Sequence, residues 1–140
     1  MGQLTDVLRP LYAARDREAG VEAMLAICDP EIEFKPGGLW LDDASMLHGR
    51  EEVAEFFGRL ADAFEDMHFE PERFEERDDA VAVLVRLEVR GRHSGITDSR
   101  TLGHLWRFRD GRVIAIRAFN EPDDAFAALS PKPGSAADDG

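Results

Sequence analysis

Three consecutive stretches in the second half of the sequence alternate apolar and polar residues, and this alternation limits the fold more than any other feature. The first stretch, AVAVLVRLEVR (80–90), has on one face Val81, Val83, Val85, Leu87 and Val89. The connection GRHSGITDS leads to TLGHLWRFR (101–109), and Asp110-Gly111 is a strong hairpin turn into RVIAIRAFN (112–120). The pattern predicts three antiparallel strands in succession.

The first half of the sequence has helical spacing instead. The stripe that predicts a first helix, with Tyr12 facing inward, consists of Leu4, Val7, Leu8, Leu11 and Tyr12. Pro10 is expected to kink this helix or to delay its start. A second short helix is expected over residues 21–28, ending at the Asp29-Pro30 turn signal. Cys28 is interpreted as a small buried thiol, because no basic partner is nearby in the sequence.

The third helix has the clearest pattern, because its apolar residues keep to one face: Val53, Phe56, Phe57, Leu60 and Phe64. A short strand is expected at 31–35 and a weak edge strand at 69–77. Helices followed by a long antiparallel run of strands are typical of an α+β domain. We therefore expect a cone-shaped, strongly curved, mostly antiparallel sheet wrapped around about three N-terminal helices, with an internal apolar pocket.

The composition indicates a folded domain and disfavours several classes of partner. Of the 140 residues, 44% are hydrophobic and 33% are charged, and the formal net charge is -12. An acidic surface disfavours binding to nucleic acid or to an anionic membrane, and no apolar run is long enough to cross a bilayer. The single cysteine and the lack of a secretory signal predict a cytoplasmic protein. Residues 1–129 are expected to form one domain, followed by a disordered tail at 130–140.

Three segments occur in an order that points to a known family. They are CDPEIEF (28–34), HGREEVAEFFGRL (48–60) and HLWRFRDGRVIAIRAF (104–119). In these segments the chain resembles the SnoaL-like branch of the nuclear transport factor 2-like superfamily, over roughly residues 4–128. None of the segments is a catalytic signature, and the superfamily mixes enzymes with non-catalytic members, so the resemblance implies the fold rather than the reaction.

The ketosteroid isomerases of that superfamily suggest roles for individual residues. Their oxyanion-hole tyrosine corresponds to Tyr12, and their second oxyanion-hole group, a protonated aspartic acid, corresponds to His104. The resemblance thus implies that Tyr12 and His104 are the catalytic pair and polarise one ligand oxygen. Their general-base aspartate corresponds to Lys35, which cannot accept a proton at neutral pH unless its pKa is strongly lowered. This departure argues against a steroid isomerase.

His104 shares the inward face of its strand with Leu102, Trp106 and Phe108. A histidine there either serves the pocket or is a core group bonded to a neighbour, and both interpretations stay open. The expected substrate-binding residues are Lys35, Trp40, Val85, Trp106, Ile116, Ala118 and Asn120. Asn120 is expected at the pocket mouth and Trp40 at one end of the cavity, while the direction of Lys35 stays open.

No metal or cofactor is expected. The four histidines, His48, His68, His93 and His104, lack the short spacing of zinc ligands, and no glycine-rich phosphate cradle is present. Arg86 and Glu88 alternate on the outer face of the sheet, where members of the family commonly bury a second copy. Opposite charges across a sheet suit such a self-complementary contact, so a homodimer is expected.

Two functions remain open after these considerations. The first is a SnoaL-like protein that binds a small, apolar, carbonyl-bearing molecule and acts on it as an isomerase or cyclase-type enzyme. The second is a non-catalytic module of the same fold that only sequesters a ligand or dimerises. In the first, His104 is the group that moves a proton or donates to the carbonyl oxygen.

Overall fold

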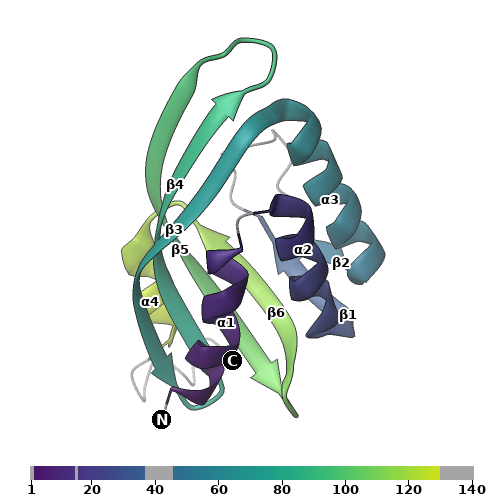
Figure 1. The fold of residues 1–140 in the computed structure, drawn as a ribbon. Helices are drawn as coiled ribbons and strands as arrows, with labels where there is room; N and C mark the ends of the chain where they lie inside the picture. Colours follow the sequence, from purple (N-terminus) through teal and green to yellow (C-terminus); the bar gives the residue numbers. More distant parts are fainter. Residues whose placement is uncertain (1, 15, 37–45, 130–140) are drawn as a thin grey trace.

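The computed structural model describes residues 2–14, 16–36 and 46–129, and these residues form one six-stranded sheet with four helices (Figure 1). The elements are α1 (Gln3–Ala13), α2 (Arg17–Ala26), β1 (Cys28–Lys35), β2 (Leu47–His48), α3 (Arg50–Ala63), β3 (Phe64–Arg77), β4 (Ala80–Gly91), β5 (Thr97–Arg109), β6 (Arg112–Phe119) and α4 (Pro122–Leu129). The strand order is β2-β1-β6-β5-β4-β3. Only the β1–β6 pair of this sheet is parallel, which confirms the expected α+β class with a mostly antiparallel sheet.

The curved sheet is covered on both sides. Helices α1, α2 and α3 lie on one side of it and α4 lies on the other (Figure 1). The main core fills the space between the first three helices and the sheet, where the fully buried side chains include Leu8, Ile32, Val53, Val81, Val83, Val85 and Leu87. Burial of each such side chain stabilises the fold by about 1.5–3 kcal/mol. The predicted inward face of β4 is therefore confirmed.

The predicted hairpin between β5 and β6 is confirmed by its backbone. Asp110 has φ 53° and Gly111 has φ 81°, so both central residues are left-handed, as a tight hairpin turn requires. The β5–β6 register shifts by one residue between Arg107 and Phe108, and beyond this shift His104 lies opposite Ala118 on β6. On its other side His104 lies opposite Val83 on β4. The turn and the register shift together set the neighbours of His104.

The start of the chain differs from the expectation. Helix α1 begins at Gln3 and contains Pro10, so the late start is wrong. Val7, expected on the inward stripe, is 42% exposed, whereas Thr5, Leu8 and Tyr12 are buried. The prediction of an inward Tyr12 is confirmed, because Leu8 and Tyr12 are one helical turn apart on the face that meets the sheet.

The predicted turn at Asp29-Pro30 is wrong, because both residues lie in strand β1. The helix before it ends at Ala26, and the amide of Val113 donates to the carbonyl oxygen of Ile27 at 2.9 Å, which aligns β1 with β6. The β1–β6 register shifts between Cys28 and Glu33. Proline is tolerated in a strand at such an irregularity, since its missing N–H breaks no regular ladder bond.

Helix α4 was not expected from the sequence. It packs on β4 and β5, and a second apolar cluster forms there from Ala80, Ala82, Leu105 and Leu129. Gly103 makes this contact close: a Cβ atom at Gly103 would lie 2.7 Å from the Cβ of Ala125 and 3.1 Å from the Cα of Pro122. The segment around His104 is therefore packed on both faces of β5.

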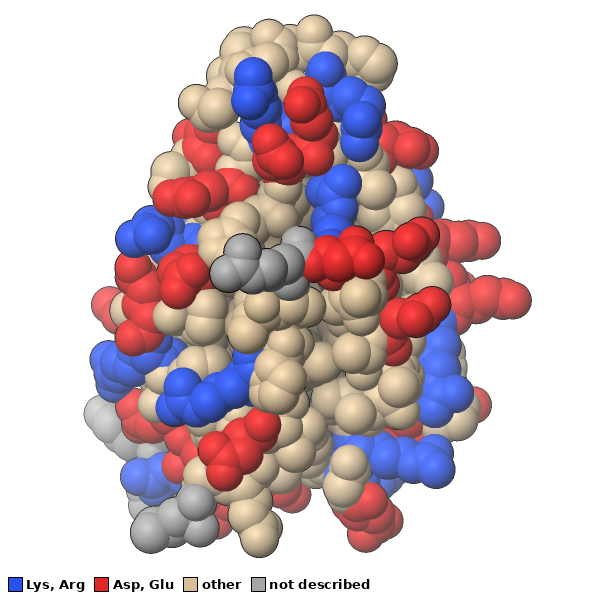
Figure 2. All heavy atoms as spheres, viewed as in Figure 1, with Lys and Arg blue, Asp and Glu red and all other residues tan. Residues whose placement is uncertain are grey.

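Charges of both signs are mixed on the face of the molecule that Figure 2 presents, with uncharged atoms between them in its lower half. No single-sign patch dominates this face, because acidic and basic side chains lie among one another on it. Within the described residues, none of the helices has both the length and the apolar character needed to cross a membrane. The tail expected at 130–140 lies outside the described residues.

Candidate functional site

A partly open cavity of about 160 Å³ lies between the sheet and the first three helices. Its wall is mostly apolar and includes Leu11, Met24, Phe34, Phe57, Met67, Phe69, Trp106 and Ile116. An engineered apolar cavity of about 150 Å³ holds benzene. The enclosed part of this pocket therefore accommodates about one aromatic ring, and a larger ligand has to extend through the mouth.

His104 stands in the wall of this cavity, on the inward face of β5. Its ring stacks on the ring of Tyr12 from α1, with centroids 5.8 Å apart and an interplanar angle of 24°. The ring of Phe69 from β3 lies 5.6 Å away on a tilt. Two aromatic rings from different elements thus hold the imidazole in one orientation, and the inward placement predicted for His104 is confirmed.

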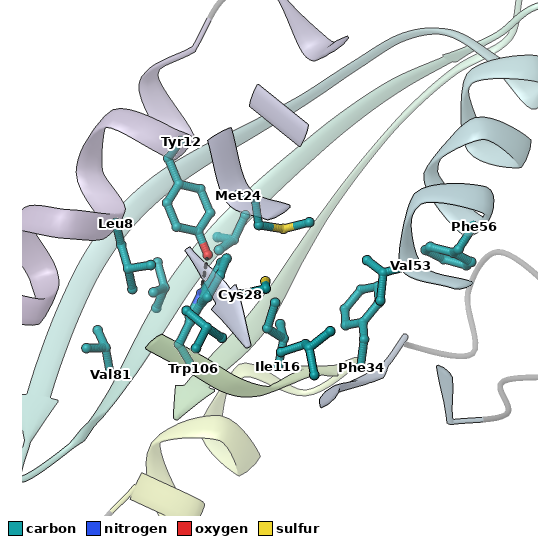
Figure 3. Packing of buried hydrophobic residues seen from close by; sticks show 14 of the residues in the cluster. Leu8, Tyr12, Met24, Cys28, Phe34, Val53, Phe56, Val81, Trp106 and Ile116 are labelled. Atoms are coloured by element: carbon teal, nitrogen blue, oxygen red, sulfur yellow. Dashed lines mark hydrogen bonds between the residues drawn. The ribbon is translucent and has the colours of Figure 1, made fainter. Parts of the chain in front are cut away.

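A chain of two hydrogen bonds joins Trp106, Tyr12 and His104. The indole N–H of Trp106 donates to the Tyr12 hydroxyl at 2.9 Å, as the dashed line in Figure 3 marks. The same hydroxyl lies 2.6 Å from Nδ1 of His104. Because an indole nitrogen only donates, the phenol oxygen accepts from Trp106, and the phenol O–H is available to donate to Nδ1 of His104. We therefore assign Nδ1 as the acceptor and place the imidazole proton on Nε2.

The electrostatics of the pair agree with two neutral groups. Burial lowers the pKa of His104 to about 4, because a buried imidazolium loses its hydration. Burial also raises the pKa of Tyr12 far above its ordinary value, by more than the hydrogen bond from Trp106 lowers it. At neutral pH the pocket therefore holds a neutral imidazole and a neutral phenol.

In the hydrogen-bonded series Trp106, Tyr12 and His104, the Nε2–H of His104 is the donor left without an acceptor among the described residues. No residue in the described ranges bonds to it. Among these residues, Arg17 Nη1 is the one side-chain nitrogen or oxygen that is both fully covered and without a partner. Because Nε2 of His104 also lacks a partner but is not in that state, it keeps accessible surface, and His104 lines the cavity. A neutral imidazole N–H aimed into an apolar cavity can donate to a carbonyl oxygen or stabilise an enolate.

Three further polar residues line the cavity, and sequence reasoning missed all of them: Asp16, Arg17 and His68. Asp16 is exposed and caps α2, because its carboxylate accepts from the amide of Glu18 at 3.2 Å. His68 is exposed and lies 2.8 Å from Glu70. The only sequence signal at this place is the capping aspartate before a helix, which says nothing about a cavity.

Some of the predicted substrate-binding residues line the cavity and others do not. Trp106, Ile116 and Ala118 line the cavity, together with Tyr12 and His104. Val85 is fully buried and faces the core below the cavity wall, where it pairs with Leu102. Trp40 lies outside the described residues.

Lys35 and Asn120 are the remaining two, and neither is a lining residue of the described cavity. Ile32 and Phe34 are buried, so Lys35, which alternates with them on β1, points to the other side of the sheet beside Arg117. Asn120 follows the end of β6 and is exposed. Strand alternation thus answers the open question of the direction of Lys35, and Asn120 lies beyond the end of β6, outside the lining residues.

The described residues contain no cluster of three or more His, Cys, Asp or Glu side chains that suits a metal ion.

Cys28 lies beside a basic side chain. Arg50 donates to the carbonyl oxygen of Cys28 through Nε at 3.0 Å and Nη2 at 2.6 Å. Burial, countered in part by Arg50, raises the pKa of the Cys28 thiol to about 11. The thiol is therefore protonated and unreactive, as its interpretation as a packing residue implies.

Comparison with known proteins places this site in a family. The model of the SnoaL-like domain matches residues 8–116. No curated protein matches the chain. A nuclear transport factor 2-like protein of unknown function from Burkholderia pseudomallei K96243 is 21% identical, with a TM-score of 0.75 over 94% of this chain and 100% of that one.

Two other solved structures have the same fold. TerC, co-crystallised with polyporic acid, is 23% identical with a TM-score of 0.72, covering 89% of this chain and 95% of that chain. A candidate SnoaL-like polyketide cyclase from Jannaschia sp. CCS1 is 19% identical with a TM-score of 0.68, covering 93% and 90%. Identities this low show the fold alone, whereas the family model spans most of the chain. The chain therefore belongs to the SnoaL-like domain family.

Proposed function

We propose that this protein binds a small, apolar carbonyl compound, with the carbonyl oxygen accepting a hydrogen bond from Nε2–H of His104. The observation that carries the proposal is that Nε2 of His104, to which we assign the imidazole proton, has no partner among the described residues although His104 stands in the wall of a mostly apolar cavity. A ligand that fills the cavity shields this N–H from water, so a ligand oxygen that accepts from it is favoured over an apolar group at the same place. The polyporic acid in the TerC crystals supports the use of this fold to hold an organic compound.

Tyr12 and Trp106 serve this site by positioning rather than by direct contact. The phenol proton is committed to Nδ1 of His104, and the indole proton is committed to the phenol. Both bonds favour the tautomer that presents Nε2–H to the ligand. In this proposal Tyr12 does not share the ligand oxygen with His104 while the chain of bonds is intact, which differs from the role that the isomerase resemblance implies.

The test compares two probes that differ in a single acceptor. Acetophenone matches the size of the cavity and carries a carbonyl, whereas α-methylstyrene has the same shape with a CH₂ group in place of the oxygen. We expect acetophenone to bind more tightly by about tenfold, since one hydrogen bond in an apolar site contributes about 1 kcal/mol or more. Binding is measured by calorimetry or by the fluorescence of the tryptophans.

Two variants make the test specific. His104→Phe keeps an aromatic ring but removes the donor, so the preference for acetophenone should vanish. His104→Gln keeps an amide N–H at a similar reach, so part of the preference should return. Equal binding of the two probes by the wild type, or an unchanged preference in His104→Phe, would overturn the proposal. Thermal unfolding of each variant separates a binding effect from a loss of folding.

A second candidate function is enolisation of the bound ketone, and the carboxylate of Asp16 in the cavity lining favours it. A proton leaves the carbon beside the carbonyl and passes to Asp16, while the electrons of the broken C–H bond form the enolate, whose oxygen accepts from His104. Exchange of the methyl hydrogens of acetophenone in D₂O, followed by NMR, tests this step. Asp16→Asn should abolish the exchange and His68→Gln should not. Exchange no faster than in buffer would leave binding alone as the function.

The homodimer through the outer face of the sheet belongs to this proposal as well. The outer face carries exposed ion pairs, with Arg86 Nη1 lying 3.1 Å from Glu72 and Arg86 Nε lying 3.4 Å from Glu88. Because α4 covers the part of this face over β4 and β5 near Gly103, the contact is proposed for the charged part. Sedimentation of the wild type and of Arg86→Glu tests it, with a dimer expected only for the wild type. A cytoplasmic location is likewise proposed.

A further inference from the structure

Arg17 combines two features that the carbonyl site does not use. It is the first residue of α2, half-buried, and its side chain lines the cavity. One guanidinium nitrogen, Nη2, donates to the carbonyl oxygen of Phe64 at 3.2 Å. The other, Nη1, is covered and has no hydrogen-bond partner, and in the described part of the chain it is the one covered side-chain polar atom in this state.

The charge of Arg17 is also unpaired among the residues that the structure describes. The ion pairs of the described residues involve other cations, and none of them joins Arg17 to a carboxylate. The adjacent Asp16 is exposed, and its carboxylate accepts from the amide of Glu18. A guanidinium withdrawn from water normally has an anionic partner or a full set of acceptors, because its desolvation is otherwise uncompensated.

Anchoring the end of α3 does not account for Arg17. Arg92 provides such an anchor nearby, since its Nε and Nη2 both donate to the carbonyl oxygen of Ala61, at 3.3 Å and 2.8 Å. Arg92 is exposed, lies outside the cavity lining and uses both arms of its fork on one oxygen. Arg17 forms one hydrogen bond through Nη2, and its Nη1 has no acceptor among the described residues. Nη1 of Arg17 is therefore the atom that needs a partner.

We propose that Arg17 is an anion-binding residue of this pocket, and that the ligand is an apolar keto acid whose carboxylate pairs with Arg17. The inference rests on the proposed function, since it adds an acidic group to the same carbonyl-bearing ligand. A carboxylate matches the planar guanidinium fork and supplies the acceptor that Nη1 lacks. In this proposal the long Arg17 side chain rotates to bring Nη1 to the ligand, and its one hydrogen bond, to the carbonyl oxygen of Phe64 at 3.2 Å, is given up if the rotation requires it.

The size of the cavity agrees with a ligand of this class. About one aromatic ring fills the enclosed space of about 160 Å³, and the rest of the ligand extends outward. Arg17 and Asp16 come from the start of α2, and Asp16 is exposed, so this part of the lining forms the mouth. A ring inside, a carbonyl at His104 and a carboxylate toward Arg17 would thus give both His104 Nε2–H and Arg17 Nη1 an acceptor.

The experiment uses 3-benzoylpropanoate, its methyl ester and acetophenone as three probes of the full-length protein. The acid and the ester share the phenyl ketone and differ in the charge at the far end. We expect the acid to bind at least tenfold more tightly than the ester, even in about 0.15 M salt, which screens the net negative charge of the surface. Affinities are measured by calorimetry.

The variants separate a ligand contact from a structural role. Arg17→Met keeps the apolar stem and should weaken binding of the acid by at least tenfold, while binding of the ester and acetophenone changes less than twofold. Arg92→Met removes the comparable anchor of α3 and should leave all three affinities unchanged. A thermal unfolding curve for each variant shows whether it is folded.

The outcomes distinguish this inference from the proposed function. If acetophenone binds in a manner that depends on His104, but the acid binds no better than the ester, the carboxylate site is refuted and the carbonyl site stands. The same conclusion follows if Arg17→Met weakens the acid and the ester equally. If none of the three probes binds, both proposals are refuted.

Discussion

The hydroxyl of Tyr12 lies 2.6 Å from Nδ1 of His104, and this bond decides which imidazole nitrogen is available to a ligand in the pocket. The two residues are 92 positions apart in the sequence and come from α1 and β5. With Nδ1 occupied, Nε2 carries the proton and is the atom available to a ligand. Trp106, two residues beyond His104 on the same face of β5, completes the arrangement by donating to Tyr12.

The tautomer of His104 can be observed directly. In the wild type, ¹⁵N NMR should show a protonated Nε2 and an unprotonated Nδ1 for His104. In Tyr12→Phe the donor to Nδ1 is lost, so we expect a mixture of tautomers. The free energy of unfolding should fall by about 2 kcal/mol, because Nδ1 of His104 and the indole N–H of Trp106 lose their partner in a buried place.

The exposed His68 serves as the internal control for that experiment, since it bonds to Glu70 and not to Tyr12. Its tautomer signals should be the same in the wild type and in Tyr12→Phe. A wild-type spectrum with the proton on Nδ1 of His104 would contradict the assignment.

The stability of the protein should fall in mildly acidic solution because of His104. Its pKa is lowered by burial to about 4, whereas an unfolded histidine titrates near 6.5. Below about pH 6.5 the imidazole of His104 is protonated in the unfolded chain but stays neutral in the native state. The contribution of His104 to the free energy of unfolding is therefore fully present above about pH 6.5 and is lost as the pH falls toward 4. The loss from this group amounts to about 3 kcal/mol at most.

Urea unfolding of the wild type and of His104→Gln across this pH range isolates the effect. Glutamine does not titrate, so the difference in stability between the two proteins should shrink or change sign as the pH falls from 6.5 to 4. A constant difference would show that His104 titrates near its ordinary pKa.

Gly103 is expected to be intolerant of alanine because of helix α4. A Cβ atom there would lie 2.7 Å from Ala125 and 3.1 Å from the carbonyl oxygen of Pro122, so α4 has to move away from β5. We expect Gly103→Ala to lower the free energy of unfolding by about 1–3 kcal/mol and to speed amide exchange in α4. Gly58→Ala is the matched control, because Gly58 is in α3 with nothing within 4 Å of the added atom. It should be neutral or stabilising.

The carboxylate of Glu76, which is far from α1 in the sequence, caps the N-terminus of that helix. Its carboxylate accepts from the amide and the hydroxyl of Thr5, at 3.0 Å and 2.9 Å, while the N-cap residue Gly2 offers no side chain. Desolvation acts against the charge, but the bonds from Thr5 and Leu4 outweigh it and lower the pKa of Glu76. Glu76→Ala should therefore cost about 1 kcal/mol at neutral pH.

The neighbouring Glu75 provides the comparison for Glu76. It forms an exposed ion pair with Arg73 at 2.7 Å, and such pairs contribute little. Glu75→Ala should thus leave the free energy of unfolding nearly unchanged. Equal losses in the two variants, measured by thermal or urea unfolding, would mean that the bonds to Thr5 do not stabilise α1.

The elements of the fold that repeat a local pattern could be predicted from the sequence. The period of two in β4 and β5 placed Val83 and His104 inward, and the Asp110-Gly111 turn was recognisable because only a few residues adopt left-handed backbone readily. Strand β1 was predicted too short, since Pro30 usually ends a strand and its tolerance depends on a register shift against β6. Helix α4 was missed because its stability comes from contacts with β5 that local spacing does not reveal.

On β4 and β5 the sequence by itself determined which side chains face inward, because alternation is a property of the local backbone. Tertiary structure alone decided what those side chains meet: it brought Tyr12 to Nδ1 of His104, turned Lys35 to the opposite face and set Arg17 in the wall of the same cavity. Hydrogen-bond partners and desolvation depend on groups that are far apart in the chain, and no local periodicity carries that information.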